Sequence, residues 1–201
     1  MGPRRRTRRA APHTSPPSHL GFRVRTHVRR AYDGRMRGRA ENLLGALATS
    51  LSDEIDRVTT DAAGHGASGP AALSLLMRRP GCTIEVLRSH IGLSHSATVR
   101  LVDRLVDDGL VVRRPGGDDR EVAVHLTARG RRRALRVHEQ RRAVLGRALA
   151  GLSVSDRRHL ELLLDRVLRT EAVVHEDPQT ICRLCEVPVC PLRRCPVPAA
   201  R

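Results

Sequence analysis

Apolar residues recur every three or four positions along residues 36–79, and this spacing predicts helices. From Met36 to Val58 the pattern runs without a break, as expected for one long amphipathic helix. Glycines and a proline at 64–70 interrupt the pattern. A short helix rich in Leu and Ala is expected next, and Pro80-Gly81 should end it. The ordered part of the chain is therefore predicted to begin with two helices.

The C-terminal half shows the same spacing in two long stretches. Thr127 is the expected N-cap of the first helix, and Gly151 should end it. Ser155 is the expected N-cap of the second helix, and Pro178 should end regular structure. The predicted apolar side of the second helix carries Leu160, Leu163, Leu164, Val167 and Leu168.

Two short helices joined by a tight turn are expected in the middle of the chain. Thr83 can cap the first, Gly92 lies in the turn, and Ser94 can cap the second. Gly109 stands where a C-terminal cap glycine belongs. This arrangement predicts a helix-turn-helix. The expected inward positions are Ile84, Leu87, Ile91, Ala97, Leu101, Val102, Leu105 and Val106.

A β-hairpin is expected directly after the helix-turn-helix. Residues 110–113 and 121–126 are rich in strand-forming residues and flank a Pro-Gly-Gly-Asp turn. In the second run Val122, Val124 and Leu126 alternate, which places them on one face. The predicted fold is therefore mainly α with a small β-hairpin wing, a winged helix-turn-helix. The long apolar stripes at both ends, which the winged helix of one chain could not cover, favour N- and C-terminal dimerisation helices.

The second helix of a helix-turn-helix fits the major groove of double-stranded DNA with its first turns against the base edges. Arg100 could pair with guanine, and Val99 could touch a thymine methyl group. Arg104 lies one turn further along the helix, and its side chain is expected to contact a DNA phosphate or a neighbouring residue of the helix. The candidate DNA-contacting residues of this helix are His95, Ser96, Val99, Arg100 and Arg104.

The hairpin tip is rich in charge. Arginine on a narrow wing suits the minor groove, where negative potential is concentrated. An acidic side chain nearby can hold the tip in place by pairing with a basic side chain. An ordinary solvated turn is the alternative interpretation. The candidate residues are Arg113, Arg114, Asp118 and Arg120, and Asp119 lies between the last two.

The charge of the chain is concentrated near its start. The formal net charge is +16, and residues 1–39 hold twelve Arg and a single acid, Asp33. Residues 1–35 are expected to form a disordered Arg-rich arm, which either adds non-specific phosphate affinity or is a dispensable leader. No apolar run is long enough to span a membrane, and no apolar segment follows the first arginines. We therefore expect a cytoplasmic, nucleoid-associated protein without a membrane partner.

Residues 72–130 resemble the winged-helix core of the multiple-antibiotic-resistance regulator (MarR) family. The resemblance rests on GLSHSATVRLVDRLVDDGLVVR, on the D-x-R motif from Asp118 to Arg120, and on the HLTARG that follows. With the flanking helices it covers roughly residues 36–175. Glu121 departs from the family, in which a basic residue or a small residue is common at this position.

The resemblance implies a homodimer on a pseudo-palindromic operator, usually a repressor that a small-molecule inducer or thiol oxidation releases. It implies that Arg120 enters the minor groove and that Asp118 holds the wing. It also implies an apolar ligand pocket between the dimerisation and DNA-binding regions. The Arg-rich arm and the C-terminal cysteines lie outside the common pattern of the family.

Four of the five cysteines lie in the C-terminal tail, at C-x2-C-x4-C-x4-C spacing: Cys182, Cys185, Cys190 and Cys195. Thiolates at such spacing can share one metal ion. Zinc is the first candidate, an iron–sulfur cluster is the alternative, and a thiol–disulfide switch is the third interpretation. Cys82 is expected to be a buried structural thiol.

These expectations divide the chain into the arm at 1–35, a winged-helix domain at 36–176 and a cysteine-rich tail at 177–201. The leading functional hypothesis is a dimeric transcriptional regulator whose tail binds a metal or senses redox state. The alternative is a basic nucleic-acid-binding structural or interaction protein with a metal-stabilised tail. No nucleotide-binding loop and no serine nucleophile elbow are found in the sequence, so an enzyme is not expected.

Overall fold

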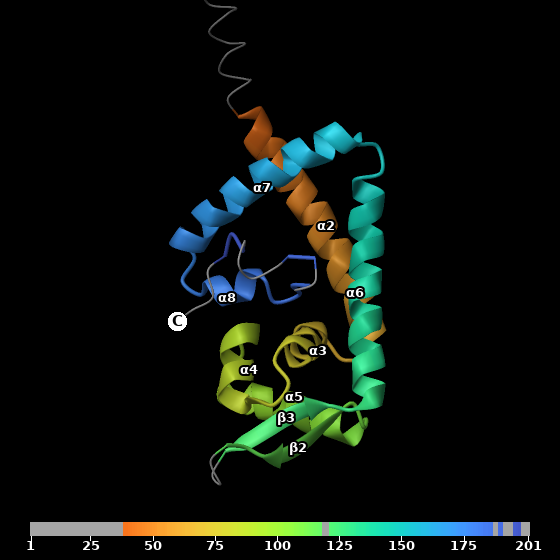
Figure 1. Cartoon of the computed structure of the whole chain (residues 1–201), viewed down its shortest axis with the longest axis vertical. Coiled ribbons are helices and arrows are strands. Elements are labelled where there is room, and N and C mark those ends of the chain that lie inside the picture. The colour runs from red at the N-terminus through yellow and green to blue at the C-terminus, as the bar shows by residue number, and fades with distance from the viewer. Residues whose placement is uncertain (1–37, 118–120, 187–188, 191–194, 198–201) are drawn as a thin grey trace, which may run out of the picture. The chain divides into compact units, whose positions relative to one another are not determined.

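The computed structural model describes residues 38–117, 121–186, 189–190 and 195–197 (Figure 1). The chain divides into two compact units, residues 1–48 and 49–201, and helix α2 begins in the first and ends in the second. The elements, in chain order, are α2 (Arg39–Ala63), α3 (Gly69–Arg78), β1 (Cys82–Thr83), α4 (Ile84–Ile91), α5 (His95–Asp107), β2 (Val111–Pro115), β3 (Val122–Leu126), α6 (Ala128–Ala148), α7 (Val154–Val174) and α8 (Pro178–Ile181).

The predicted helix-turn-helix and hairpin are confirmed. The helices α4 and α5 pack against each other, and β2 and β3 form the antiparallel wing. The Thr83 hydroxyl accepts a hydrogen bond from the N–H of Val86 at 3.3 Å, and the Ser94 hydroxyl accepts one from the N–H of Ala97 at 3.2 Å. These two N-caps fix where the helices begin, because each satisfies a backbone donor that the helix leaves free.

The third strand was not predicted from the sequence. Cys82 and Thr83 pair with Val124 and Ala123 of β3, so the sheet order is β1-β3-β2. This pairing also changes the predicted alternation of β3. Ala123 and Val124 are both buried, whereas Val122 is exposed, because β3 is the central strand and both of its faces are partly covered.

Two predicted boundaries near the C-terminus are wrong. The N-cap of α7 is Ser153 and not Ser155. Its hydroxyl accepts from the N–H of Asp156 at 3.2 Å, and the Asp156 carboxylate accepts from the N–H of Ser153 at 3.2 Å. Pro178 begins the short helix α8 and does not end regular structure, since proline is well tolerated in a first helical turn.

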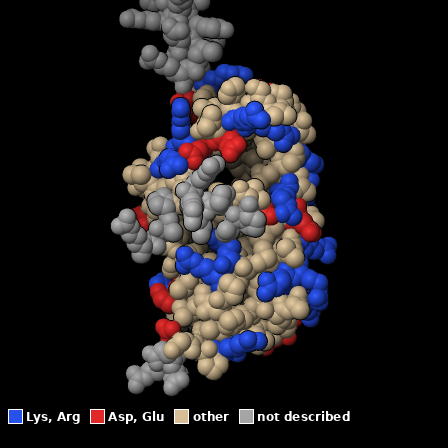
Figure 2. Space-filling view, in the orientation of Figure 1, with Lys and Arg blue, Asp and Glu red and all other residues tan. Residues whose placement is uncertain are grey.

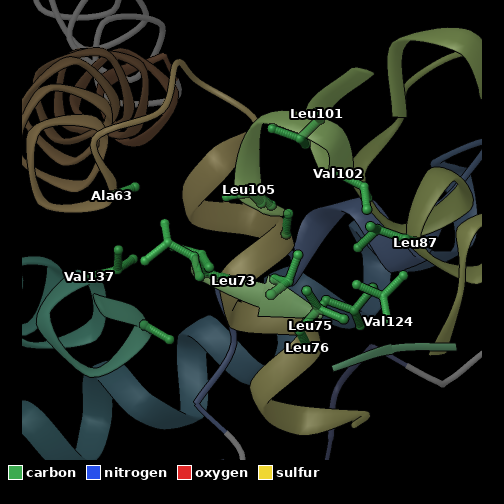
Figure 3. Close-up of a cluster of buried hydrophobic side chains, with 14 of the residues drawn as sticks. Ala63, Leu73, Leu75, Leu76, Leu87, Leu101, Val102, Leu105, Val124 and Val137 are labelled. Carbon is green, nitrogen blue, oxygen red and sulfur yellow. The ribbon is translucent and has the colours of Figure 1, made fainter. Parts of the chain in front are cut away.

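Aliphatic side chains, mostly Leu and Val, meet in one core (Figure 3). Each fully buried Leu or Val stabilises the fold by about 1.5–3 kcal/mol relative to an exposed side chain. Among the described residues this core contains no Phe, Tyr or Trp side chain, so close packing of aliphatic groups from helix and sheet must hold it. Its labelled members are Ala63, Leu73, Leu75, Leu76, Leu87, Leu101, Val102, Leu105, Val124 and Val137.

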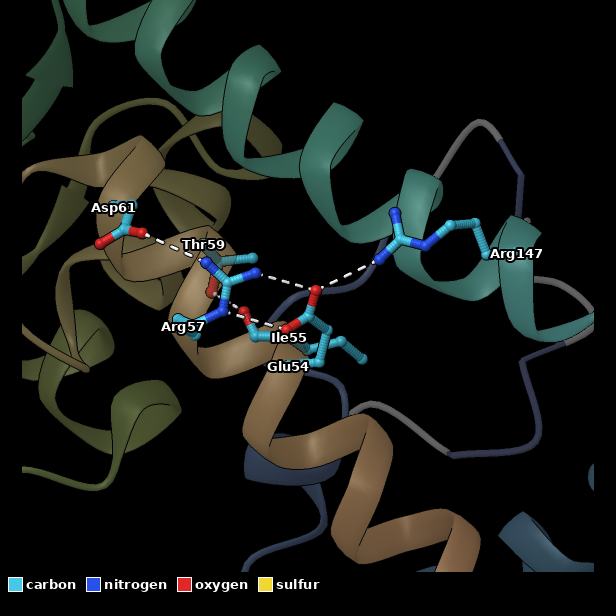
Figure 4. A network of polar contacts seen from close by, with 6 residues as sticks. All are labelled: Glu54, Ile55, Arg57, Thr59, Asp61 and Arg147. Atoms are coloured by element: carbon cyan, nitrogen blue, oxygen red, sulfur yellow. Dashed lines mark hydrogen bonds and ion pairs between the residues drawn. The ribbon is translucent and has the colours of Figure 1, made fainter.

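A polar network links the second half of α2 to α6 (Figure 4). Glu54 accepts hydrogen bonds from Arg57 at 2.9 and 3.0 Å and from Arg147 of α6 at 3.2 Å. The hydrogen bonds from Arg57 hold the pKa of Glu54 below its ordinary value. These groups are exposed, so the network orients the two helices and adds little stability.

The end of α5, the start of β2 and the start of α6 meet at Leu110. Gly109, with a φ of 64°, turns the chain out of α5. The carbonyl oxygen of Leu110 then accepts from the N–H of Thr127 at 3.0 Å. Gly130 lies so close to this carbonyl that a Cβ atom there would stand 1.9 Å from the oxygen. Only glycine fits at this position of α6.

Residues 39–48, in the first unit, form the beginning of α2. Leu43, Leu44 and Leu47 lie on this segment and are each about half exposed. The predicted arm at 1–35 and Met36 lie outside the described residues.

Replacing Gly130 with Ala should destabilise the protein by about 1–3 kcal/mol, because the added methyl group overlaps the Leu110 carbonyl. Thermal or urea unfolding measures this change. The matched control is Gly146→Ala in the same helix, where an added Cβ has nothing within 4 Å, so stability should stay equal or rise by up to about 1 kcal/mol. Equal stability of the two variants would contradict the close approach at Leu110.

Candidate nucleic-acid interface

Helix α5 presents a polar face at its N-terminal end. Ser94 caps the helix, and His95, Ser96 and Arg100 are exposed on its first turns. Val99 is half-buried and Arg104 is exposed. The opposite face is buried through Leu101, Val102 and Leu105 and anchors the helix in the core. Four of the five residues predicted on this helix are therefore exposed, and packing fixes the direction in which they point.

A buried hydroxyl stabilises the first turn of α5. Thr98 is fully buried, and its hydroxyl donates to the carbonyl of Ser94 at 2.9 Å. This bond satisfies a polar group that burial would otherwise leave without a partner. The burial of the Thr98 side chain anchors the first turn, which carries the candidate base contacts, on the domain.

The wing is joined to α5 by an ion pair. The guanidinium of Arg113 on β2 donates to the carboxylate of Asp103 on α5 at 2.6 Å. Arg113 was predicted as a DNA contact; this exposed ion pair partly neutralises its charge, and its contact with DNA stays a prediction. Arg114, the next residue of β2, is exposed. Sequence reasoning missed Asp103 as a positioning residue, because its partner lies on another element.

The described part of the hairpin ends in a close turn. The N–H of Gly116 donates to the carbonyl of Glu121 at 2.8 Å, which closes the ladder between β2 and β3. Asp118, Asp119 and Arg120 lie outside the described residues. Their predicted roles in holding the wing and entering the minor groove therefore stay predictions.

The beginning of α6 carries a basic cluster that the sequence reasoning did not single out. Arg129, Arg131 and Arg132 are exposed in the first turns of this helix. Positive side chains are unfavourable beside the positive end of a helix dipole, so the run ARGRRR is a signal that could have been found in the sequence. Figure 2 shows basic side chains gathered on the edge of the molecule along which α6 runs.

A pocket of about 320 Å³ lies between the α2–α3 loop and α5. Arg100 and Arg104 line it from the recognition helix, and Gly66 and Ser68 line it from the loop. The pocket therefore shares side chains with the candidate DNA-reading face.

Cys82 lies in β1 and has only 9% of its surface exposed. Burial raises the pKa of its thiol to about 11. At neutral pH this thiol is protonated and unreactive, which fits the predicted structural role.

The four tail cysteines are gathered in one place, and each is a free thiol. Contact with the Cys182 thiol lowers the pKa of Cys185 to about 6, while contact with Cys185 raises the pKa of Cys182 above its ordinary range. Burial raises the pKa of Cys190. Among the residues that the structure describes, no three His, Cys, Asp or Glu side chains already surround one ion position.

None of the helices in the described part of the chain has the length and apolar character that a membrane span requires.

The fold and the exposed face of α5 define the class of the protein: it is a winged helix-turn-helix DNA-binding protein. A family model described as "MarR family" matches residues 70–121, from the start of α3 to the residue before β3. The HTH-type transcriptional regulator PetP of Rhodobacter capsulatus is 30% identical over 133 residues, which cover 62% of this chain and 77% of that protein. The chain belongs to the MarR family of DNA-binding transcription regulators, which are not enzymes.

Solved structures of the family share the fold. A MarR family protein from Bacillus stearothermophilus is 28% identical, with a TM-score of 0.59 over 70% of this chain and 97% of that one. A MarR family regulator from Silicibacter pomeroyi is 27% identical, with a TM-score of 0.53 over 70% of this chain and 94% of that one. The YusO protein from Bacillus subtilis is 18% identical, with a TM-score of 0.59 over 67% of this chain and 95% of that one, and this likeness concerns the fold alone.

Cys82 should react with iodoacetamide about 100-fold more slowly in the native protein than in urea, because raising its pKa from 9.0 to about 11 removes thiolate at every pH below that value. The native rate should rise with pH up to about 11. Peptide mapping after timed pulses at pH 7–9 measures the reaction at Cys82 separately from the tail. A native rate equal to the rate in urea would contradict the burial of this thiol.

Proposed function

We propose that the protein is a homodimeric repressor that binds a pseudo-palindromic operator through α5 and the wing. The observation that carries the proposal is the polar N-terminal face of α5, held rigidly by the Ser94 cap and a buried apolar face. Side chains at the start of a recognition helix are the ones that reach base edges in the major groove.

Each candidate DNA-contacting residue of α5 has a chemical role in this proposal. Arg100 donates to a guanine, and Ser96 and His95 hydrogen-bond to bases or phosphates. Val99 contacts a thymine methyl group, and Arg104 contacts a phosphate. On the wing, Arg114 contacts the DNA backbone, Asp118 holds the tip and Arg120 enters the minor groove. Arg113 positions the wing through its ion pair with Asp103. The basic start of α6 adds positive potential near the base of the wing.

Exposed apolar side chains support the homodimer. Leu163, Leu164 and Val167 of α7 are 56%, 44% and 43% exposed in the single chain. On the first segment of α2, Leu43, Leu44 and Leu47 are also about half exposed. Large apolar side chains grouped on a helix favour a protein partner over water. A second copy of the chain is the partner that a palindromic operator requires.

The release of this repressor by a small molecule forms part of the proposal. The pocket beside α5 offers one place for a ligand, since Arg100 and Arg104 line it. An anionic occupant would neutralise two arginines that the proposal assigns to DNA.

A broad nucleic-acid-binding protein is the competing function, favoured by the twelve Arg of residues 1–39. Footprinting on the DNA that flanks the protein's own gene distinguishes the two. A discrete protected palindrome that persists at physiological salt supports the repressor. Uniform coverage that disappears as salt rises would establish the alternative.

Replacing Arg100 with Ala should weaken operator binding by about 1–3 kcal/mol, because a bidentate contact to one base pair is lost. The same change should relax specificity at that base pair. The control is Arg158→Ala, which removes the same charge from an exposed position of α7. Affinities for operator and random DNA, measured by fluorescence anisotropy at several salt concentrations, test this. Equal losses on both DNAs would exclude a base contact.

Replacing Val167 with Asp should shift the protein from dimer to monomer, because a charge at an apolar interface is left without a partner. The matched control is Val122→Asp on β3, where Val is likewise 43% exposed and no dimer contact is proposed. Light scattering coupled to size exclusion measures the mass of each variant. If Val167→Asp stays dimeric, α7 does not form the interface.

A further inference from the structure

Two buried donor atoms of a half-buried cation have no acceptor. Arg78 lies in the last turn of α3, and its Nε and Nη2 atoms are buried without a hydrogen-bond partner among the described residues. A buried donor that lacks a partner destabilises the fold, and more so when it is charged. An anionic group is therefore expected beside Arg78 in the working protein.

Thiol groups of the cysteine tail lie within electrostatic range of this cation. Cys185, Cys182 and Cys195 all interact electrostatically with the Arg78 guanidinium. Arg141 of α6 acts on Cys185 from another side. A neutral thiol is a weak acceptor, whereas a thiolate is a charged one. Thiolate at the tail would satisfy the buried donors of Arg78.

The four tail thiols form a continuous group. The Cys185 thiol contacts those of Cys182 and Cys190, and the Cys190 thiol contacts that of Cys195. Two backbone turns bring them together. The N–H of Cys185 donates to the carbonyl of Cys182 at 2.8 Å, and the N–H of Cys190 donates to the carbonyl of Glu186 at 3.0 Å.

Other contacts hold the tail on the domain independently of the thiols. Leu184 packs against the hydrophobic core, and Val197 is buried. Glu186 forms an ion pair with Arg142 of α6. Helix α8, just before the cysteines, contacts α4 and α7. The thiols are thus presented to Arg78 by a packed scaffold.

We propose that Cys182, Cys185, Cys190 and Cys195 together bind a metal centre as thiolates, with Arg78 as its buried counter-cation. The shared chemistry is tetrathiolate coordination, which a zinc ion or an iron–sulfur cluster accepts. To bind one metal centre, the four sulfur atoms must leave their contacts with one another and surround a shared position, because the described side chains do not yet surround one ion position. The proposal requires rotation of the cysteine side chains on this scaffold.

The charges of such a centre match its surroundings. Each thiol releases its proton on binding, so Zn²⁺ with four thiolates carries a net charge of −2. Arg78 and Arg141 place two positive charges beside the same thiols. The centre would close the tail over the end of α3 and beside α4, the first helix of the helix-turn-helix.

The test begins with the full chain, purified anaerobically and without chelator. Elemental analysis, a labile-sulfide assay and the visible spectrum should show about one centre per protomer. Zinc would give a colourless protein without sulfide, and an iron–sulfur cluster would give iron, sulfide and visible absorbance. If the protein loses its metal during purification, titration with Co²⁺ should give a tetrahedral thiolate spectrum, or reconstitution with iron and sulfide should give a cluster. Cys185→Ser should abolish binding, and Cys82→Ser, the matched control, should preserve it.

Three outcomes would overturn the proposal. The first is a protein that takes up neither metal nor cluster and whose four tail thiols alkylate freely. The second is a native tail whose intact mass shows disulfides before any exposure to oxidant. The third is equal metal binding by Cys185→Ser and the unchanged protein.

The role of Arg78 has its own comparison. Arg78→Gln should lower metal affinity by about 10–100-fold, as expected when an outer partner of a metal site is lost. Arg79→Gln, the exposed neighbour, should leave the affinity unchanged. Competition with a chelating dye measures the metal affinity of both variants. If Arg78→Gln fails to fold, Arg78→Lys, which keeps the charge, is measured in its place. Equal affinity in Arg78→Gln, Arg79→Gln and the unchanged protein would remove Arg78 from the centre.

Discussion

The carbonyl groups of Gly109 and Leu110 connect the parts of this regulator through Thr127. The N–H of Thr127 donates to Leu110 at 3.0 Å, its hydroxyl donates mainly to Gly109 at 2.8 Å with Leu110 at 3.2 Å, and the same hydroxyl accepts from the N–H of Gly130 at 3.0 Å. Helix α5 ends here, β2 begins and α6 starts. Since α6 leads directly into α7, whose exposed apolar residues we assign to the dimer, this junction links the dimer to the DNA-reading helix and the wing.

The sequence predicted the local features of this frame and missed those that depend on distant partners. Thr83, Ser94 and Thr127 were correct N-caps, because a cap is a bond between residues three positions apart. Strand β1 was missed because two residues become a strand only by pairing with Val124, far along the chain. Ser155 was predicted as the N-cap of α7 because it precedes the apolar pattern, but Ser153 forms the reciprocal bonds with Asp156.

The same division applies to the candidate site. The exposed face of α5 followed from helical spacing, because the apolar residues that anchor the helix also determine which residues point outward. Arg113 was predicted as a DNA contact, and its partner Asp103 could not be predicted, since that pair crosses from helix to strand. Arg78 looks in the sequence like another solvated arginine. Its burial depends on how the tail packs, and spacing carries no information on this.

The arginines of this chain are therefore not equivalent, although the composition presents them as one basic surplus. Arg57, Arg88, Arg113, Arg142 and Arg169 are paired with acids among the described residues. Such pairing cancels charge and leaves little attraction for phosphate. Arg100 of α5 and the first arginines of α6 are exposed outside these pairs. Specific attraction to DNA is then a property of a few placed charges, whereas any affinity that the Arg-rich residues 1–39 add is predicted to be non-specific and to fall as salt rises.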